Sequence, residues 1–194
     1  MRIYSILCIG LLLISPLQAK TMLILGDSLS AGYGLPTEQS WPQMLDRELA
    51  DWDFTNASIS GETSQGALNR LPALLATNPD ALLVEIGAND GLRGYPVQRI
   101  RTNIQQIIDM ARQAQIKVVL MQIRIPPNYG PRYTQQFETM YQELATENNL
   151  VLWPFFMEKI AVDPTLMQPD GLHPNAKGQP LIVEQLKPLF EQLK

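Results

Sequence analysis

Short apolar runs alternate along this chain with longer segments in which apolar residues recur every three or four positions. Short runs bounded by turn residues are typical of buried strands, and the longer period is typical of amphipathic helices. We expect five strands, over Met22–Leu25, Phe54–Ile59, Ala81–Ile86, Val118–Ile123 and Leu150–Trp153. We expect five helices between and after them, over Trp41–Leu49, Gln65–Ala76, Val97–Ala114, Tyr133–Ala145 and Ala176–Leu193.

This alternation predicts an α/β fold with one five-stranded parallel sheet. Strands joined through helices run parallel, and right-handed crossovers place the helices on both faces of the sheet. Ligands of such sheets bind at the carboxyl ends of the strands. We see no internal repeat and no linker, so residues 20–194 are expected to form a single domain. The loop Pro126–Pro131, rich in proline and glycine, follows a strand and is expected at the ligand edge.

The first nineteen residues have the pattern of a secretory signal peptide. Arg2 is positively charged, Ile6–Ile14 is almost entirely apolar, and Leu17-Gln18-Ala19 ends on a small residue. The apolar run is shorter than the roughly 20 residues that a spanning helix needs. We therefore expect cleavage after Ala19 and a periplasmic or secreted protein, with a retained membrane anchor as the alternative. Cys8 is the only cysteine, so the exported chain would hold no disulfide.

Charge and motifs exclude several classes of function. The formal net charge is −4 and no basic run occurs, so nucleic acid and anionic membrane surfaces are poor partners. The chain contains neither a phosphate-binding loop of the Gly-x-x-x-x-Gly-Lys-Ser/Thr type nor a His-Glu-x-x-His motif. With one histidine and one cysteine, a zinc site is not expected. We predict no metal and no cofactor, and a monomer that acts on a small molecule.

Four loops that are expected at the ligand edge carry polar or glycine residues: Asp27-Ser28, Ser60–Thr63, Gly87–Asp90 and Asp170–His173. A serine hydroxyl attacks an acyl group only when a neighbouring base takes its proton. His173 is the only histidine of the chain, and Asp170 lies three residues before it, where a carboxylate can orient the ring. Together these residues suggest a serine hydrolase with Ser28 as nucleophile.

Acyl transfer also needs hydrogen-bond donors for the negative oxygen of the tetrahedral intermediate. The backbone N–H groups of Ser28 and Gly61 and the side-chain amide of Asn89 are the candidates. Each candidate also has a purely structural interpretation. Ser28 would cap a helix, Gly61 and Asn89 would form turns, and His173 would begin a helix before Pro174. Asp27 is expected to accept backbone N–H bonds within its own turn.

These motifs resemble the four sequence blocks of the SGNH (GDSL) hydrolases. The matching residues are Gly26-Asp-Ser-Leu29, Gly61, Gly87-Ala-Asn-Asp90 and Asp170-Gly-Leu-His-Pro174. Longer stretches are similar to the bacterial thioesterase I, lysophospholipase and arylesterase branch, namely Leu25–Tyr33, Asn56–Ser64, Asn89–Gly94 and Met121–Pro126. The resemblance spans about Thr21 to Leu193.

The resemblance implies a three-layer α/β/α sandwich with flavodoxin-like strand order. It implies that Ser28, Asp170 and His173 form a catalytic triad, with Ser28, Gly61 and Asn89 as the oxyanion hole. It also implies thioesters, aryl esters, short-to-medium acyl esters and lysophospholipids as substrates.

Apolar residues on the edge loops are the only clue to the substrate within the sequence itself. They are Leu29, Tyr33, Leu35, Leu92, Tyr95, Ile123, Ile125, Pro126, Pro127 and Tyr129, several of which core packing would explain equally well. A groove of these residues favours a fatty acyl chain over a sugar. Two alternatives stay open, a carbohydrate deacetylase on the same scaffold and a non-catalytic periplasmic binding module.

Overall fold

Five parallel strands form the central sheet of the protein, which a computed structural model describes over residues 19–193. The strands are β1 (Lys20–Gly26), β2 (Trp52–Asn56), β3 (Ala81–Glu85), β4 (Lys117–Met121) and β5 (Val151–Trp153). Their order in the sheet is β2-β1-β3-β4-β5, and every neighbouring pair is parallel. The predicted parallel sheet and its flavodoxin-like order are confirmed.

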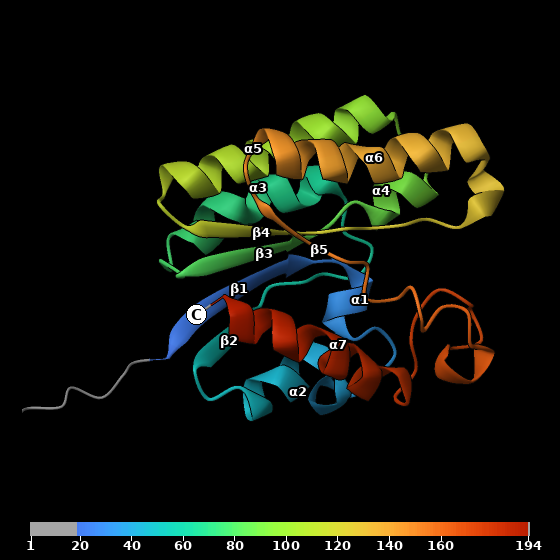
Figure 1. Ribbon diagram of the computed structural model, residues 1–194, viewed down its shortest axis with the longest axis horizontal. Coiled ribbons are helices and arrows are strands. Elements are labelled where there is room, and N and C mark those ends of the chain that lie inside the picture. The colour runs from blue at the N-terminus through green and yellow to red at the C-terminus, as the bar shows by residue number, and fades with distance from the viewer. Residues whose placement is uncertain (1–18, 194) are drawn as a thin grey trace, which may run out of the picture.

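Helices cover both faces of this sheet and complete three layers (Figure 1). The seven α-helices of the described residues are α1 (Ser28–Ala31), α2 (Trp41–Glu48), α3 (Ser64–Leu75), α4 (Ala88–Leu92), α5 (Val97–Gln113), α6 (Pro131–Glu147) and α7 (Gly178–Gln192). Short 3-10 helices lie at Thr37–Gln39, Pro127–Tyr129 and Pro164–Leu166. Helices α3 to α6 lie on one face, and α1, α2 and α7 lie on the other (Figure 1).

Burial on both faces explains the apolar runs of the central strands. All five residues of β3 are buried, as are Met22–Gly26 of β1, which is the pattern expected of parallel strands that are covered on both sides. The edge strand β2 is different. It spans Trp52–Asn56 rather than the predicted Phe54–Ile59, and only Trp52 in it is fully buried. Residues 57–59 lie in the loop after β2, where the N–H groups of Ala57 and Ile59 still donate to carbonyl oxygens of β1.

Two short helices, α1 and α4, were not predicted from the sequence. They are four and five residues long, and a helix of about one turn shows no apolar period that could reveal it. Each begins within three residues of the end of a central strand, β1 for α1 and β3 for α4. Both therefore lie at the carboxyl edge, where a strand-to-helix turn presents side chains to a ligand.

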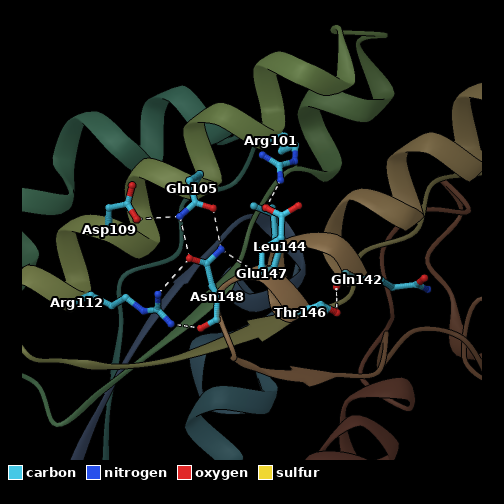
Figure 2. Close-up of polar contacts among 9 residues, drawn as sticks. All are labelled: Arg101, Gln105, Asp109, Arg112, Gln142, Leu144, Thr146, Glu147 and Asn148. Carbon is cyan, nitrogen blue, oxygen red and sulfur yellow. Dashed lines mark hydrogen bonds and ion pairs between the residues drawn. The ribbon is translucent and has the colours of Figure 1, made fainter.

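Polar contacts around Asn148 join the end of α6 to several turns of α5 (Figure 2). Asn148 follows α6 and exchanges two hydrogen bonds with Gln105, of 3.0 and 2.7 Å. Arg112 donates to the side-chain and backbone oxygens of Asn148, and Arg101 pairs with Glu147. This network fixes α5 and α6 relative to each other on the outside of the sheet.

The expected signal peptide lies almost wholly outside the described residues, and so does Cys8. Within residues 19–193, no helix is long and apolar enough to cross a bilayer.

Candidate active site

Ser28 lies at the turn between β1 and α1. Asp27 caps this helix, because its Oδ1 accepts the N–H of Leu29 at 3.1 Å. The expectation that Asp27 bonds within its own turn is confirmed, and the cap is Asp27 rather than Ser28. Gly26 allows the close approach behind the turn, since a β-carbon there would lie 2.7 Å from Glu85 Oε2. The Ser28 hydroxyl is thus left free to face another loop.

That loop carries His173, between β5 and α7. Asp170 organises the loop through its Oδ1, which accepts the N–H groups of Leu172 and His173 at 2.9 and 3.1 Å. Its Oδ2 lies 2.6 Å from His173 Nδ1. Helix α7 begins only at Gly178, so His173 does not begin a helix. The ring of Tyr33 packs against the imidazole, with ring centroids 4.4 Å apart.

His173 Nε2 lies 2.8 Å from Ser28 Oγ, so the three predicted residues form one continuous line of contacts. Burial alone would raise the pKa of Asp170, but the hydrogen bonds from His173 and from the two loop amides outweigh it and lower the pKa to about 2. An ionised Asp170 keeps the proton on Nδ1, which leaves Nε2 to accept the Ser28 proton.

The predicted oxyanion donors lie around the same pocket. As the first residue of α1, Ser28 has no intrahelical acceptor for its N–H. Gly61 has φ +79°, a conformation that favours glycine, and the space where its β-carbon would lie is open. Asn89 lies in α4 and donates from Nδ2 to Asp27 Oδ2 at 3.2 Å. One amide hydrogen of Asn89 is therefore bound, and the other is available to a ligand.

Two buried carboxyl groups lie behind the nucleophile. Burial raises the pKa of Asp27 to about 6, although the Leu29 amide, the charge of His173 and the Asn89 amide oppose the increase. Glu85, at the end of β3, is fully buried and accepts the hydroxyl of Ser30 at 2.6 Å. Its burial, reinforced by the charge of Asp27, raises the pKa of Glu85 well above its usual range.

Glu85 is expected to make the protein less stable as the pH rises. Below pH 4.5, the usual pKa of a glutamate, Glu85 is protonated in both the folded and the unfolded chain, and its contribution to stability is complete. Above that pH the unfolded chain releases the proton, so stability falls by up to about 1.4 kcal/mol per pH unit. In Glu85→Gln this contribution should vanish. Urea unfolding of both proteins from pH 5 to pH 8 measures it, and parallel pH profiles would refute the assignment.

A pocket of about 800 Å³ opens beside Ser28, Gly61, Asn89 and His173. Six of the ten predicted groove residues line it, namely Leu29, Tyr33, Leu92, Ile125, Pro126 and Pro127. The prediction was wrong for Leu35, Tyr95, Ile123 and Tyr129, which do not line the pocket. Ile123 is fully buried in the core, and the Tyr129 hydroxyl instead donates to the Leu92 carbonyl at 2.8 Å.

One wall of the pocket was not predicted. It comes from the long segment between β5 and α7, drawn in orange beside α1 in Figure 1. Its apolar members are Phe155, Met157, Ala161, Val162, Met167 and Leu172. Arg124 and Glu158 also line the pocket, and they form an ion pair with an N–O distance of 2.6 Å. Within residues 19–193, no cluster of three or more His, Cys, Asp or Glu side chains could hold a metal ion.

Comparison with known proteins agrees with this geometry. The profile of the GDSL-like lipase/acylhydrolase family matches residues 24–181. The chain belongs to this family. Among its relatives, an arylesterase of Vibrio mimicus is 44% identical over 188 residues, which cover 94% of each chain. The thioesterase 1/protease 1/lysophospholipase L1 of Escherichia coli (strain K12) is 48% identical over 88% of this chain and 85% of the relative.

A solved structure of the family is similarly close. The psychrotrophic esterase EstA from Pseudoalteromonas sp., inhibited by monoethylphosphonate, superposes with a TM-score of 0.87 and 47% identity, over 90% of this chain and 98% of EstA. The predicted family, the predicted α/β fold and the predicted class, an enzyme that hydrolyses esters, are therefore confirmed.

Proposed function

We propose that this protein is a serine esterase and thioesterase in which Ser28, His173 and Asp170 form the catalytic triad. One observation carries the proposal. Asp170 contacts His173, and His173 contacts Ser28, at distances of 2.6 and 2.8 Å, beside a largely apolar pocket. That arrangement matches the geometry by which a triad is recognised, whatever the fold.

In the acylation step, His173 Nε2 takes the hydroxyl proton of Ser28 as Oγ attacks the acyl carbon. The ionised Asp170 stabilises the imidazolium that forms. His173 then gives this proton to the leaving alcohol or thiol, and Ser28 keeps the acyl group. In the second step, water loses a proton to His173 as its oxygen attacks the acyl carbon, and His173 gives this proton to Ser28 Oγ as the carboxylic acid leaves, which restores the serine. Tyr33, packed on the ring, shields one side of the base from solvent.

The carbonyl oxygen becomes negative in both steps. The N–H groups of Ser28 and Gly61 and the Asn89 amide are the three donors that we assign to it. Asn89→Ala removes a bond made chiefly in the transition state, so kcat should fall by roughly 10²–10³ with little change in KM. Steady-state kinetics and thermal melts test this. A lower melting temperature with an unchanged kcat would remove Asn89 from the oxyanion hole.

We propose acyl chains, rather than sugars, as the groups that fill the pocket. Thirteen of its lining side chains are apolar or aromatic, the imidazole of His173 not counted, and pockets of this character favour hydrocarbon. The names of the Vibrio and Escherichia relatives fit aryl esters, thioesters and lysophospholipids. A panel of acetyl to palmitoyl chains, presented as aryl esters, acyl thioesters and lysophospholipids, tests the proposal. Turnover should rise beyond acetyl, and a preference for acetyl throughout would contradict it.

The two alternative functions predict different results. A carbohydrate deacetylase would need a polar groove with aromatic platforms, and it would release acetate from acetylated sugars in the same panel. A binding module would hold the acyl compound without turnover. The apolar pocket weighs against the first alternative, and the contacts of Ser28 with His173 weigh against the second.

We also propose that the chain is exported, with residues 1–19 as a signal peptide and residues 20–194 as one hydrolase domain. The enzyme would then act in the periplasm or outside the cell, as a monomer without a stable membrane anchor. The mature chain should begin at or near Lys20. Intact-mass measurement of protein from a periplasmic extract tests this, and a chain that retains Met1 in the membrane fraction would favour the anchor.

A further inference from the structure

The oxyanion donors of the proposed function come from separate parts of the chain, so something must fix their spacing. Gly61 lies on the loop between β2 and α3, whereas Asn89 lies on α4, beyond β3. The bond from Asn89 to Asp27 sets one side chain relative to the nucleophile turn. It does not reach the Gly61 loop. A displacement of about 1 Å at a reacting centre can cost roughly a hundredfold in rate.

Asp90 bridges this gap through both of its carboxylate oxygens. Its Oδ2 accepts the backbone N–H of Ser64 at 2.7 Å, and its Oδ1 accepts the Ser64 hydroxyl, also at 2.7 Å. Asp90 directly follows Asn89, and Ser64 is three residues beyond Gly61. Asn103, from α5, donates to the Ser64 hydroxyl oxygen at 2.9 Å and holds it in place from the other side.

The surroundings of Asp90 give this bridge its rigidity. Asp90 and Ser64 are almost completely buried, with exposed fractions of 1% and 0%. Within residues 19–193, no Lys, Arg or His side chain forms an ion pair with Asp90. The carboxylate is instead held by the first residue of α3, where the helix dipole favours negative charge. A buried charge of this kind is costly unless its few hydrogen bonds stay formed.

A second contact joins the same two segments on the exposed side. Arg93, directly after α4, donates from Nη2 to the Gly61 carbonyl oxygen at 3.1 Å. The Gly61 loop is thus fastened to the α4 segment at Ser64 and at Gly61 itself. Because the Arg93 contact is exposed, it contributes little, and the buried Asp90 bridge is the firm connection.

We propose, on the basis of the function proposed above, that Asp90 is a positioning residue that sets the spacing of the oxyanion donors through Ser64. It touches no substrate. It acts by holding the Gly61 loop against the segment that carries Asn89. In the sequence, Asp90 belongs to the block Gly87–Asp90 of the family resemblance, but no role was predicted for it, and Asn89-Asp90-Gly91 also suits a turn.

The first test compares Asp90→Ala with Asp90→Asn. Asp90→Ala should lower kcat for a short aryl ester about 10- to 100-fold, with KM changed less than about twofold. Asparagine keeps an oxygen for the Ser64 N–H and a polar group for its hydroxyl, so Asp90→Asn should recover most of the loss. If circular dichroism shows that Asp90→Ala does not fold, Ser64→Ala is used in its place. That variant loses the hydroxyl contact with Asp90 and keeps the backbone N–H contact. A kcat close to wild type in the folded variant overturns the proposal.

A double-mutant cycle with Asn89→Ala separates positioning from general stability. If Asp90 acts through the oxyanion hole, the losses in kcat from Asp90→Ala and Asn89→Ala should combine to clearly less than their product, because donors to one oxyanion are coupled and coupled residues are non-additive. If the loss in kcat of the double variant equals the product of the losses of the two single variants, the proposal is overturned. Arg70→Gln is the matched control. It breaks the Glu62–Arg70 ion pair of the same loop, with an N–O distance of 2.5 Å, and should leave kcat near wild type.

Failure of this inference and failure of the proposed function give different results. If wild-type protein hydrolyses no ester, or if Ser28→Ala remains active, the proposed function is wrong. If wild type is active, Ser28→Ala is inactive, and Asp90→Ala keeps its kcat, then only the role of Asp90 is wrong.

Discussion

Ser28→Ala is expected to lower kcat for any ester substrate by more than about a thousandfold while the protein stays folded. In the proposed mechanism the hydroxyl oxygen is the atom that attacks, so its removal would leave only substrate binding and the remaining oxyanion donors. The substitution deletes one partly exposed oxygen whose contact is to His173, so the melting temperature should change little. Initial rates on an aryl ester, with a thermal melt of the same preparation, measure both effects. Residual activity above about a thousandth of wild type would argue against Ser28 as nucleophile.

His173→Ala should be as damaging, because the chain contains no second histidine. Without the imidazole, the Ser28 proton has no acceptor, and the leaving group has no donor. Asp170 cannot substitute, since the pKa of its carboxyl is held near 2 and it lies behind the ring. We expect a loss of more than about a thousandfold in kcat at neutral pH. Activity that returned on raising the pH toward 10, where hydroxide can act as the base, would fit this role. Nearly normal activity at pH 7 would exclude it.

The two severe variants also differ in a useful way. His173→Ala removes the ring that packs on Tyr33 and leaves Asp170 without its side-chain partner. We therefore expect a lower melting temperature for His173→Ala than for Ser28→Ala, at a similar loss of turnover. Equal melting temperatures would show that the imidazole adds nothing to the stability of this loop.

Most of the sheet could be predicted from the sequence because the central strands are covered on both faces. A strand that is buried on both sides consists of consecutive apolar residues. Such runs identify β1, β3 and β4 in the sequence. The edge strand β2 has no such apolar run, since four of its five residues are at least partly exposed. Its predicted range was therefore displaced toward the apolar Phe54 and Ile59, and missed Trp52.

The placement of the candidate site residues Ser28 and Asn89 at one edge could be predicted because they lie shortly after strands. In a parallel sheet the carboxyl ends of the strands meet at one edge, so Ser28 and Asn89 were expected together before any distance was known. His173 was predicted on a different ground, because it is the only histidine of the chain and has Asp170 three residues before it, although the long segment of 155–172 intervenes between the last strand and the histidine.

Contacts between residues far apart in the chain could not be predicted from the sequence. Glu85 and Ser30 are 55 residues apart, and Ser64 and Asp90 are 26 apart, so no local pattern connects them. The pocket wall at 155–172 was missed for a different reason. It has neither a helical nor a strand period, so its apolar residues looked like core or loop. Ile123 and Ile125 show the same limit, as one is buried in the core and the other lines the pocket.

The central claim is that Ser28, activated by His173, is the nucleophile. Reaction with a fluorophosphonate probe, followed by peptide mapping, tests it most directly, because such probes bond covalently to an activated serine. A phosphonate is already known to inhibit the related EstA. We predict stoichiometric labelling on the peptide that contains Ser28 in the wild type, and none in Ser28→Ala or His173→Ala. Labelling of a different serine, or undiminished labelling in His173→Ala, would contradict the account.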